Sequence, residues 1–173
     1  MFPAVLEFMW VNFMPDEPCN RSLGTTRNWV VDDFYFGEAL KDGCSMAALD
    51  KDGNIVGARI GMRKMKSEWM SWFLDRLPFH TPTWLLKLMP LPENSLKILP
   101  VFIKLFTLNG YDVWKMFDQL GCDLIYEDKA LCTGRALRVR GLGTELCRRT
   151  ERLARDLGCT HTYACVSGIL LQI

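Results

Sequence analysis

The chain has 173 residues and a mass of 19.9 kDa, which suits one domain with its own hydrophobic core, so we expect a single domain over 1–173. Its 49% hydrophobic residues argue against a disordered protein, and its net charge of +1 gives no sign of a nucleic-acid partner. Six tryptophans and ten phenylalanines are consistent with a folded protein that has an apolar pocket.

The cysteines and histidines argue against disulfides and a zinc site. The seven cysteines are odd in number and form no Cys-x-x-Cys pair, so we interpret them as reduced core thiols. With only His80 and His161 as imidazole ligands, we expect no metal. The apolar N-terminal run has no basic region before it, and Glu7 interrupts it. We therefore expect no signal peptide, no membrane span and a cytoplasmic protein.

Residues 4–13 are almost all apolar, and this run predicts a strand buried on both faces. Pro15 and Pro18 should end that strand and start a turn or a helix. Glu17 then lies where a strand meets a new element, a place where a site can be built. The alternative is that Glu17 is an acid favoured by the dipole at a helix N-terminus.

A helix and a hairpin are predicted next. Asn28 can cap a helix that runs to about Lys41, with Gly43 beyond its end. Two apolar runs, 44–49 and 55–62, flank a turn that contains Asp-Gly, which is a strong hairpin signal.

Residues 63–122 are predicted to form a helical insertion that shapes the substrate side. We expect helices over 66–77, 95–108 and 112–120, with an irregular, proline-rich and apolar stretch over 78–94 between the first two. The many aromatic residues here have two interpretations. They either pack as core, or a few of them line a pocket for an apolar or aromatic substrate.

The last third of the sequence predicts a strand–helix–strand unit over 128–166. A short apolar strand over 130–133 is followed by a glycine loop, which we define as residues 138–144, and by an amphipathic helix that Gly158 ends. A second strand over 159–166 follows at once. The two strands should be parallel, with a right-handed crossover.

The glycine loop has the composition of an anion site. Gly141 and Gly143 let the backbone approach a ligand, and the first amides of the following helix have no partner within it. Together with the helix dipole, these amides suit a phosphate or a pyrophosphate, and Arg138 and Arg140 add two cations. The alternative is a glycine-rich turn before a surface helix.

The spacing of the residues in the glycine loop excludes two common phosphate-binding motifs. It has no Gly-Lys-Ser/Thr as in a Walker loop, and Leu146 stands where a Rossmann fingerprint needs its third glycine. Arg138, Gly141 and Gly143 give Arg-x-x-Gly-x-Gly, which resembles the pyrophosphate-arm signature of the GCN5-related N-acetyltransferases. That family often has glycine where Val139 stands, although valine keeps the backbone amide.

Three further stretches resemble the insect arylalkylamine (dopamine) N-acetyltransferases: 110–114, 158–163 and the Asp-Glu-Pro segment, which we define as residues 13–18. The resemblance implies an α/β (α+β) acyl-CoA N-acyltransferase fold, with a mixed central sheet flanked by helices. Relatives continue through another helix and two strands, which we expect this chain to lack. Without them, an unpaired strand edge would be exposed.

The resemblance also implies a mechanism. Acetyl-CoA would be the co-substrate, lying between the strand at 131–133 and the strand that starts at 159. Glu17 would be the general base that takes a proton from the amine, directly or through water. Ser167 would help to protonate the departing thiolate, unless it only forms a turn or a helix cap. The family has a second serine where this chain has 169–171, apolar residues.

Backbone amides would hold the two parts of acetyl-CoA. The pantetheine arm would lie along one set of residues and the pyrophosphate along another: Leu131, Cys132 and Thr133 for the arm, and Arg138, Val139, Arg140, Gly141, Leu142, Gly143 and Thr144 for the pyrophosphate.

These observations leave three candidate functions for the chain, and we prefer the first. It is an acetyl-CoA-dependent N-acetyltransferase acting on an arylalkylamine such as dopamine, serotonin, tryptamine or octopamine. The second is a truncated or degenerate relative that binds CoA without turnover, or that does not fold stably. The third, a nucleotide-binding regulatory module, is based on the glycine loop alone. For the preferred function we expect the amine and acetyl-CoA as partners, no nucleic acid or membrane, and a monomer.

Overall fold

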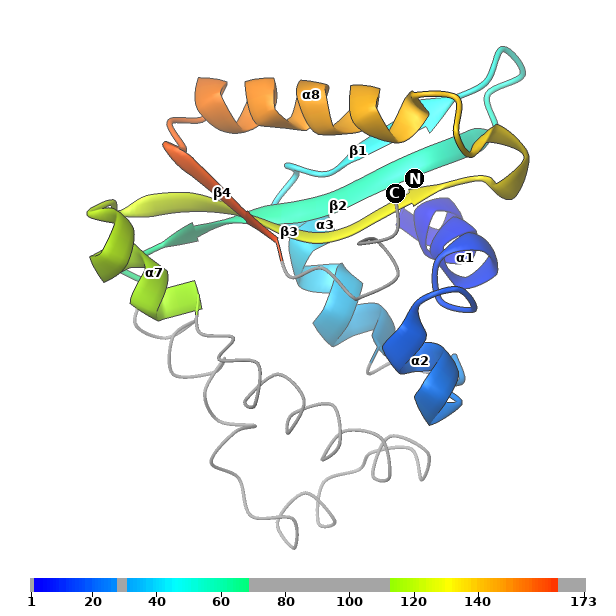
Figure 1. Cartoon of the computed structure of the whole chain (residues 1–173), viewed down its shortest axis with the longest axis horizontal. Coiled ribbons are helices and arrows are strands. Elements are labelled where there is room, and N and C mark those ends of the chain that lie inside the picture. The colour runs from blue at the N-terminus through cyan, green and yellow to red at the C-terminus, as the bar shows by residue number, and fades with distance from the viewer. Residues whose placement is uncertain (1, 28–30, 69–112, 165–173) are drawn as a thin grey trace, which may run out of the picture.

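The computed structural model describes residues 2–27, 31–68 and 113–164 (Figure 1). Their strands form a mixed sheet in the order β1-β2-β3-β4, in which the first two pairings are antiparallel and β3 pairs with β4 in parallel. The strands are β1 (Met46–Leu49), β2 (Ile55–Met65), β3 (Leu124–Thr133) and β4 (His161–Ala164).

Helices cover both faces of this sheet. Helix α8 (Leu142–Asp156) lies on one face, and α1 (Phe2–Asn12), α2 (Pro18–Leu23) and α3 (Glu38–Lys41) lie on the other side (Figure 1). Helix α7 (Val113–Leu120) packs Trp114 and Phe117 against Ile125 of β3. The predicted mixed sheet flanked by helices is thus confirmed. Within the described ranges, no helix has the length and apolar character needed to cross a membrane.

The predicted strand over 4–13 is wrong, because this run is helix α1. Val5 and Met9, four residues apart, are buried against the sheet, whereas Phe2 and Val11 are 46% and 56% exposed. A continuous apolar run does not distinguish a buried strand from a helix by its period, and a length of eleven residues favours a helix. Glu17 therefore follows a helix and not a strand.

The predicted hairpin is confirmed as β1 and β2. At its turn, the Asp50 carboxylate accepts hydrogen bonds from the amides of Asp52 and Asn54, and Gly53 has a φ of +84°. Strand β2 continues to Met65, so the predicted insertion boundary at residue 63 falls inside a strand and is wrong by three residues. Strand β2 stays paired with β3 as far as Met65 with Leu124, beyond the apolar run that the sequence shows.

The remaining helix predictions have mixed outcomes. The helix predicted over 112–120 is confirmed as α7, whereas those over 66–77 and 95–108 lie outside the described residues, apart from a turn at 66–68. The helix predicted from Asn28 is observed as a π-helix, η1 (Val31–Gly37), continued by α3. At Gly37 an added Cβ would lie 3.0 Å from the Asp32 carbonyl oxygen, so this widened turn has little room for a side chain.

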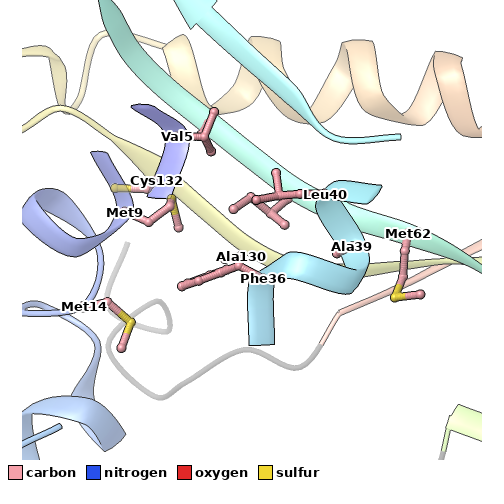
Figure 2. Close-up of a cluster of buried hydrophobic side chains, with 11 residues drawn as sticks. Val5, Met9, Met14, Phe36, Ala39, Leu40, Met62, Ala130 and Cys132 are labelled. Atoms are coloured by element: carbon pink, nitrogen blue, oxygen red, sulfur yellow. The ribbon is translucent and has the colours of Figure 1, made fainter. Parts of the chain in front are cut away.

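The main core lies between α1, α3 and the sheet (Figure 2). It combines thioethers with aliphatic and aromatic side chains from these elements, from η1 and from the segment after α1: Val5, Met9, Met14, Phe36, Ala39, Leu40, Ala58, Ile60, Met62, Ala130 and Cys132. A second cluster under α8 contains Cys44, Tyr126, Ala154 and Cys159. Cys44, Cys132 and Cys159 are buried free thiols, as predicted.

Candidate functional site

The predicted strand–helix–strand unit is confirmed as β3, α8 and β4. Strands β3 and β4 pair in parallel from Ile125 with His161 to Asp128 with Ala164. Strand β3 continues for five residues beyond this paired stretch, so Leu131 and Thr133 lie where it faces the glycine loop. An added Cβ at Gly143 would be 3.8 Å from the side chains of both. The structure thus brings the two predicted parts of the acetyl-CoA site together.

The start of α8 has the backbone geometry of an anion site. Gly141 is the N-cap residue, with a left-handed φ of 80°, and no described side chain caps the helix. The Gly141 carbonyl accepts the first bond of the helix, from Glu145. The amides of Leu142, Gly143 and Thr144 precede that bond, so they have no partner within the helix and are available to an anion.

Val139, in the glycine loop, has a strained backbone conformation. Its φ is 64°, and it is the one non-glycine residue with a positive φ in the described parts of the chain. A β-branched side chain in the left-handed region is unfavourable, by about 1–2 kcal/mol. The side chain is fully exposed, so packing does not compensate for this conformation. The glycine expected from the resemblance would adopt it freely.

Arg138, predicted as one of two cations for a phosphate, contacts Asp16 and the Asn12 carbonyl in the structure. Its Nη2 lies 2.6 Å from Asp16 Oδ2 and donates to the Asn12 carbonyl at 3.0 Å. Arg135 Nη2 donates to Asp16 Oδ1 at 2.9 Å. The hydrogen bond from Arg138 is the main reason why the pKa of Asp16 is lowered, and Arg135 adds to this effect against the opposing influence of burial. Asp16 therefore connects the Asp-Glu-Pro segment to the glycine loop.

Glu17 is the N-cap residue of α2. Its Oε2 accepts a hydrogen bond of 2.6 Å from the Asn20 amide, and the side chain is half-buried. This contact fits the alternative interpretation of Glu17 as a helix-capping acid. The same geometry leaves the second carboxylate oxygen, Oε1, without a hydrogen bond to any described residue, so a role as base is compatible with the cap.

Comparison with known proteins identifies the fold. No protein-family model matches the chain, and no curated protein matches its sequence. The structure is similar to that of arylalkylamine N-acetyltransferase 2 from Aedes aegypti, with a TM-score of 0.76 and 23% identity over 99% of this chain and 74% of that one. The chain has the fold of the GCN5-related N-acetyltransferases. Its resemblance in fold to the insect arylalkylamine N-acetyltransferases is confirmed.

Other insect enzymes with this N-acetyltransferase fold are also similar to the chain. A polyamine N-acetyltransferase of Drosophila melanogaster, which forms N-acetylagmatine, has a TM-score of 0.68 and 20% identity over 99% of this chain and 74% of its own. A mosquito protein named arylalkylamine N-acetyltransferase like 5b also has a TM-score of 0.68, with 14% identity over 94% of this chain and 70% of its own. At these identities the similarity establishes the N-acetyltransferase fold and not the substrate.

The predicted roles of two site residues, Ser167 and Arg140, stay predictions. Ser167 lies outside the described residues, as do residues 169–171, so its role in protonating a thiolate stays a prediction. Arg140 is exposed and forms no ion pair or hydrogen bond with the described residues. Its guanidinium group is therefore a candidate for binding an anion at the start of α8.

Sequence reasoning missed a buried ion pair beneath α8 in this N-acetyltransferase fold. Arg59 is 5% exposed; its Nε and Nη2 lie 2.9 Å and 2.8 Å from Asp128 Oδ2, and its Nη1 donates to the Cys147 carbonyl of α8 at 2.9 Å. Burial raises the pKa of Asp128, and Arg59 opposes this effect. Because Asp128 pairs with Ala164 of β4, the ion pair joins α8 to the paired part of β3 and β4.

A second buried carboxylate lies on the opposite face of β3. Glu127 is 1% exposed and accepts a hydrogen bond from Lys129 Nζ at 2.8 Å. The sequence signal for both acids was the charged run Glu127-Asp128-Lys129 inside a largely apolar strand, since charged residues are seldom buried without partners.

Proposed function

We propose that the chain is an N-acetyltransferase that transfers the acetyl group of acetyl-CoA to the primary amine of an arylalkylamine such as dopamine, serotonin, tryptamine or octopamine. The observation that supports this most is the uncapped start of α8 at Gly141, beside the end of β3, in an Arg-x-x-Gly-x-Gly sequence. The fold shared with insect enzymes named for arylalkylamine and polyamine acetylation agrees with it.

The residues present fit acetyl-CoA. The amides of Leu142, Gly143 and Thr144 would bind the pyrophosphate, and the backbone of 131–133 would hold the pantetheine arm. A side chain at position 143 would meet Leu131 and Thr133 at van der Waals distance, so glycine keeps the space between loop and strand open. When bound, the thioester supplies the electrophilic carbonyl carbon.

The amine must lose a proton before it can attack, because an alkylammonium ion has no free electron pair. We propose that Glu17 removes this proton, directly or through one water. Its carboxylate is held by the Asn20 amide, and its segment contacts the glycine loop through Asp16. Ser167 is proposed as the group that helps to protonate the thiolate that leaves.

A second candidate function, binding of CoA without turnover, is favoured by one observation. Glu17 already has a structural task as the cap of α2, which would account for it without any catalysis. In this case the glycine loop would still bind CoA. The cytoplasmic location and the monomeric state stay predictions.

Two measurements distinguish the candidates. Release of free thiol from acetyl-CoA in the presence of tryptamine is expected for the enzyme, with agmatine as a second amine that tests the arylalkylamine preference. A rise in melting temperature with CoA is expected for both functions, because a ligand that binds only the folded state stabilises it. Thermal stabilisation without thiol release would support the binding protein, and neither response would reject both.

A further inference from the structure

Asn20 is a buried polar residue in a short helix at the surface. It is 7% exposed, whereas the next two residues of α2, Arg21 and Ser22, are exposed. Its Nδ2 donates to Met14 Sδ at 3.4 Å, and a thioether is a weak acceptor. Because burial of an amide with so weak a partner costs free energy, the side chain contributes little to stability by itself.

The contact with Met14 fixes where α2 begins. Met14 is 4% exposed and belongs to the core cluster that also contains Cys132 of β3 (Figure 2). The side chain of Asn20 therefore anchors the first turn of α2 to the core beside β3. The amide of the same residue holds Glu17 Oε2 at 2.6 Å. One residue thus sets both the place of the turn and the orientation of the carboxylate.

We infer that Asn20 is a positioning residue for Glu17, an inference that rests on the proposed function. The Asn20 amide occupies Oε2, and Oε1 is the oxygen that takes the proton. An N–H bond of the ammonium group breaks, an O–H bond forms at Oε1, and the electron pair stays on the amine nitrogen. Oε2 then becomes the carbonyl oxygen of a neutral acid and still accepts from Asn20. Helix α2 therefore keeps its cap throughout.

A matched pair of variants tests the amide. Asn20→Ala and Asn20→Pro both remove the side chain, but only proline removes the N–H, and the first turn of a helix tolerates proline. We expect Asn20→Pro to lower kcat about tenfold relative to Asn20→Ala, the effect of one lost hydrogen bond, with KM for acetyl-CoA unchanged. In a Glu17→Gln background the two Asn20 variants should have equal kcat, since no base remains to be positioned.

If Glu17→Gln alone leaves kcat unchanged, the chain still transfers acetyl groups but Glu17 is not the base, and the inference fails. Suppose instead that Glu17→Gln lowers kcat, but Asn20→Pro lowers kcat relative to Asn20→Ala by the same factor with Glu17 and with Gln at position 17. Glu17 then remains the base, and the positioning role of Asn20 is rejected.

A spectroscopic measurement decides the contact even if Asn20→Pro does not fold. A hydrogen bond to a carboxylate is stronger than one to an amide, so the Asn20 amide proton should resonate further downfield in the wild-type chain than in Glu17→Gln. An unchanged resonance would overturn the inference whether or not the chain shows turnover.

Discussion

The glycine loop and the Asp-Glu-Pro segment serve one proposed reaction, but they are built in different ways. The loop presents backbone amides at the start of α8, and a local feature, the left-handed glycine N-cap Gly141, leaves them uncapped. The Asp-Glu-Pro segment presents side chains, and their positions depend on contacts with distant residues such as Arg138. A backbone site can therefore be read locally from a sequence, whereas a side-chain site depends on the whole fold.

The largest effect should come from the backbone site. Gly141→Glu forces a side chain into a left-handed backbone and adds a negative charge beside the pyrophosphate. We expect CoA affinity, measured by calorimetry, to fall by at least about a hundredfold. Gly53→Glu is the matched control, because Gly53 also has a left-handed φ but lies in the β1–β2 turn. Equal loss of affinity in both variants would reject the site.

On the side-chain site, Glu17→Gln separates catalysis from capping. The amide oxygen of glutamine can still accept from Asn20, but it is not a base, so kcat should fall about 100-fold or more with little change in melting temperature. Glu17→Ala should lose the same activity and also about 1 kcal/mol of stability, because the cap is lost. Equal turnover in wild type and Glu17→Gln would leave Glu17 with a structural role alone.

The link between the two regions should have a smaller effect. Asp16→Asn removes the charge that partly neutralises Arg138, so we expect CoA to bind a few times more tightly, about threefold. Because the pKa of Asp16 is lowered, the ion pair is present at neutral pH and is lost only below the usual pKa of an aspartate. The difference between variant and wild type should thus be the same at pH 7 and pH 5. Weaker binding by the variant would show that Asp16 instead holds Arg138 in place for the ligand.

The smallest effect should be relief of strain within the loop. Val139→Gly is expected to stabilise the chain by about 0.5–1 kcal/mol in chemical denaturation, without loss of CoA affinity. Glycine removes the strain of valine in the left-handed backbone, and this gain in free energy exceeds the loss from the greater conformational entropy of glycine in the unfolded state. Val11→Gly, at an exposed position in α1, should destabilise by a similar amount. Destabilisation by both substitutions would mean that Val139 is not strained.

The sequence predicted the parts of the fold that local signals determine. The Asp-Gly turn identified the hairpin, and the apolar strand, glycine loop and amphipathic helix identified the β3–α8–β4 unit. The apolar run of α1 has no polar face to show its period, because Val5 and Met9 face the sheet while the exposed positions Phe2 and Val11 are apolar too. Hence the strand prediction for 4–13 failed.

In the candidate site too, the sequence predicted what local signals determine and missed what distant contacts determine. Gly141, Gly143 and the amides that follow were predicted from spacing, and the structure places them beside Leu131 and Thr133. The contact of Asp16 with Arg135 joins residues 119 positions apart, and no local pattern indicates it. The Asn20 amide on Glu17 is local, but a glutamate followed by proline fits a cap and a base equally well.

The central claim is that unpaired amides at the start of α8 bind the pyrophosphate of acetyl-CoA. The most direct test is to titrate coenzyme A into the isotope-labelled chain and to follow the backbone amides by NMR. The largest shifts should occur at Leu142, Gly143 and Thr144, with saturation at a single site. If those three amides stay unmoved while coenzyme A is added in excess, the claim is contradicted.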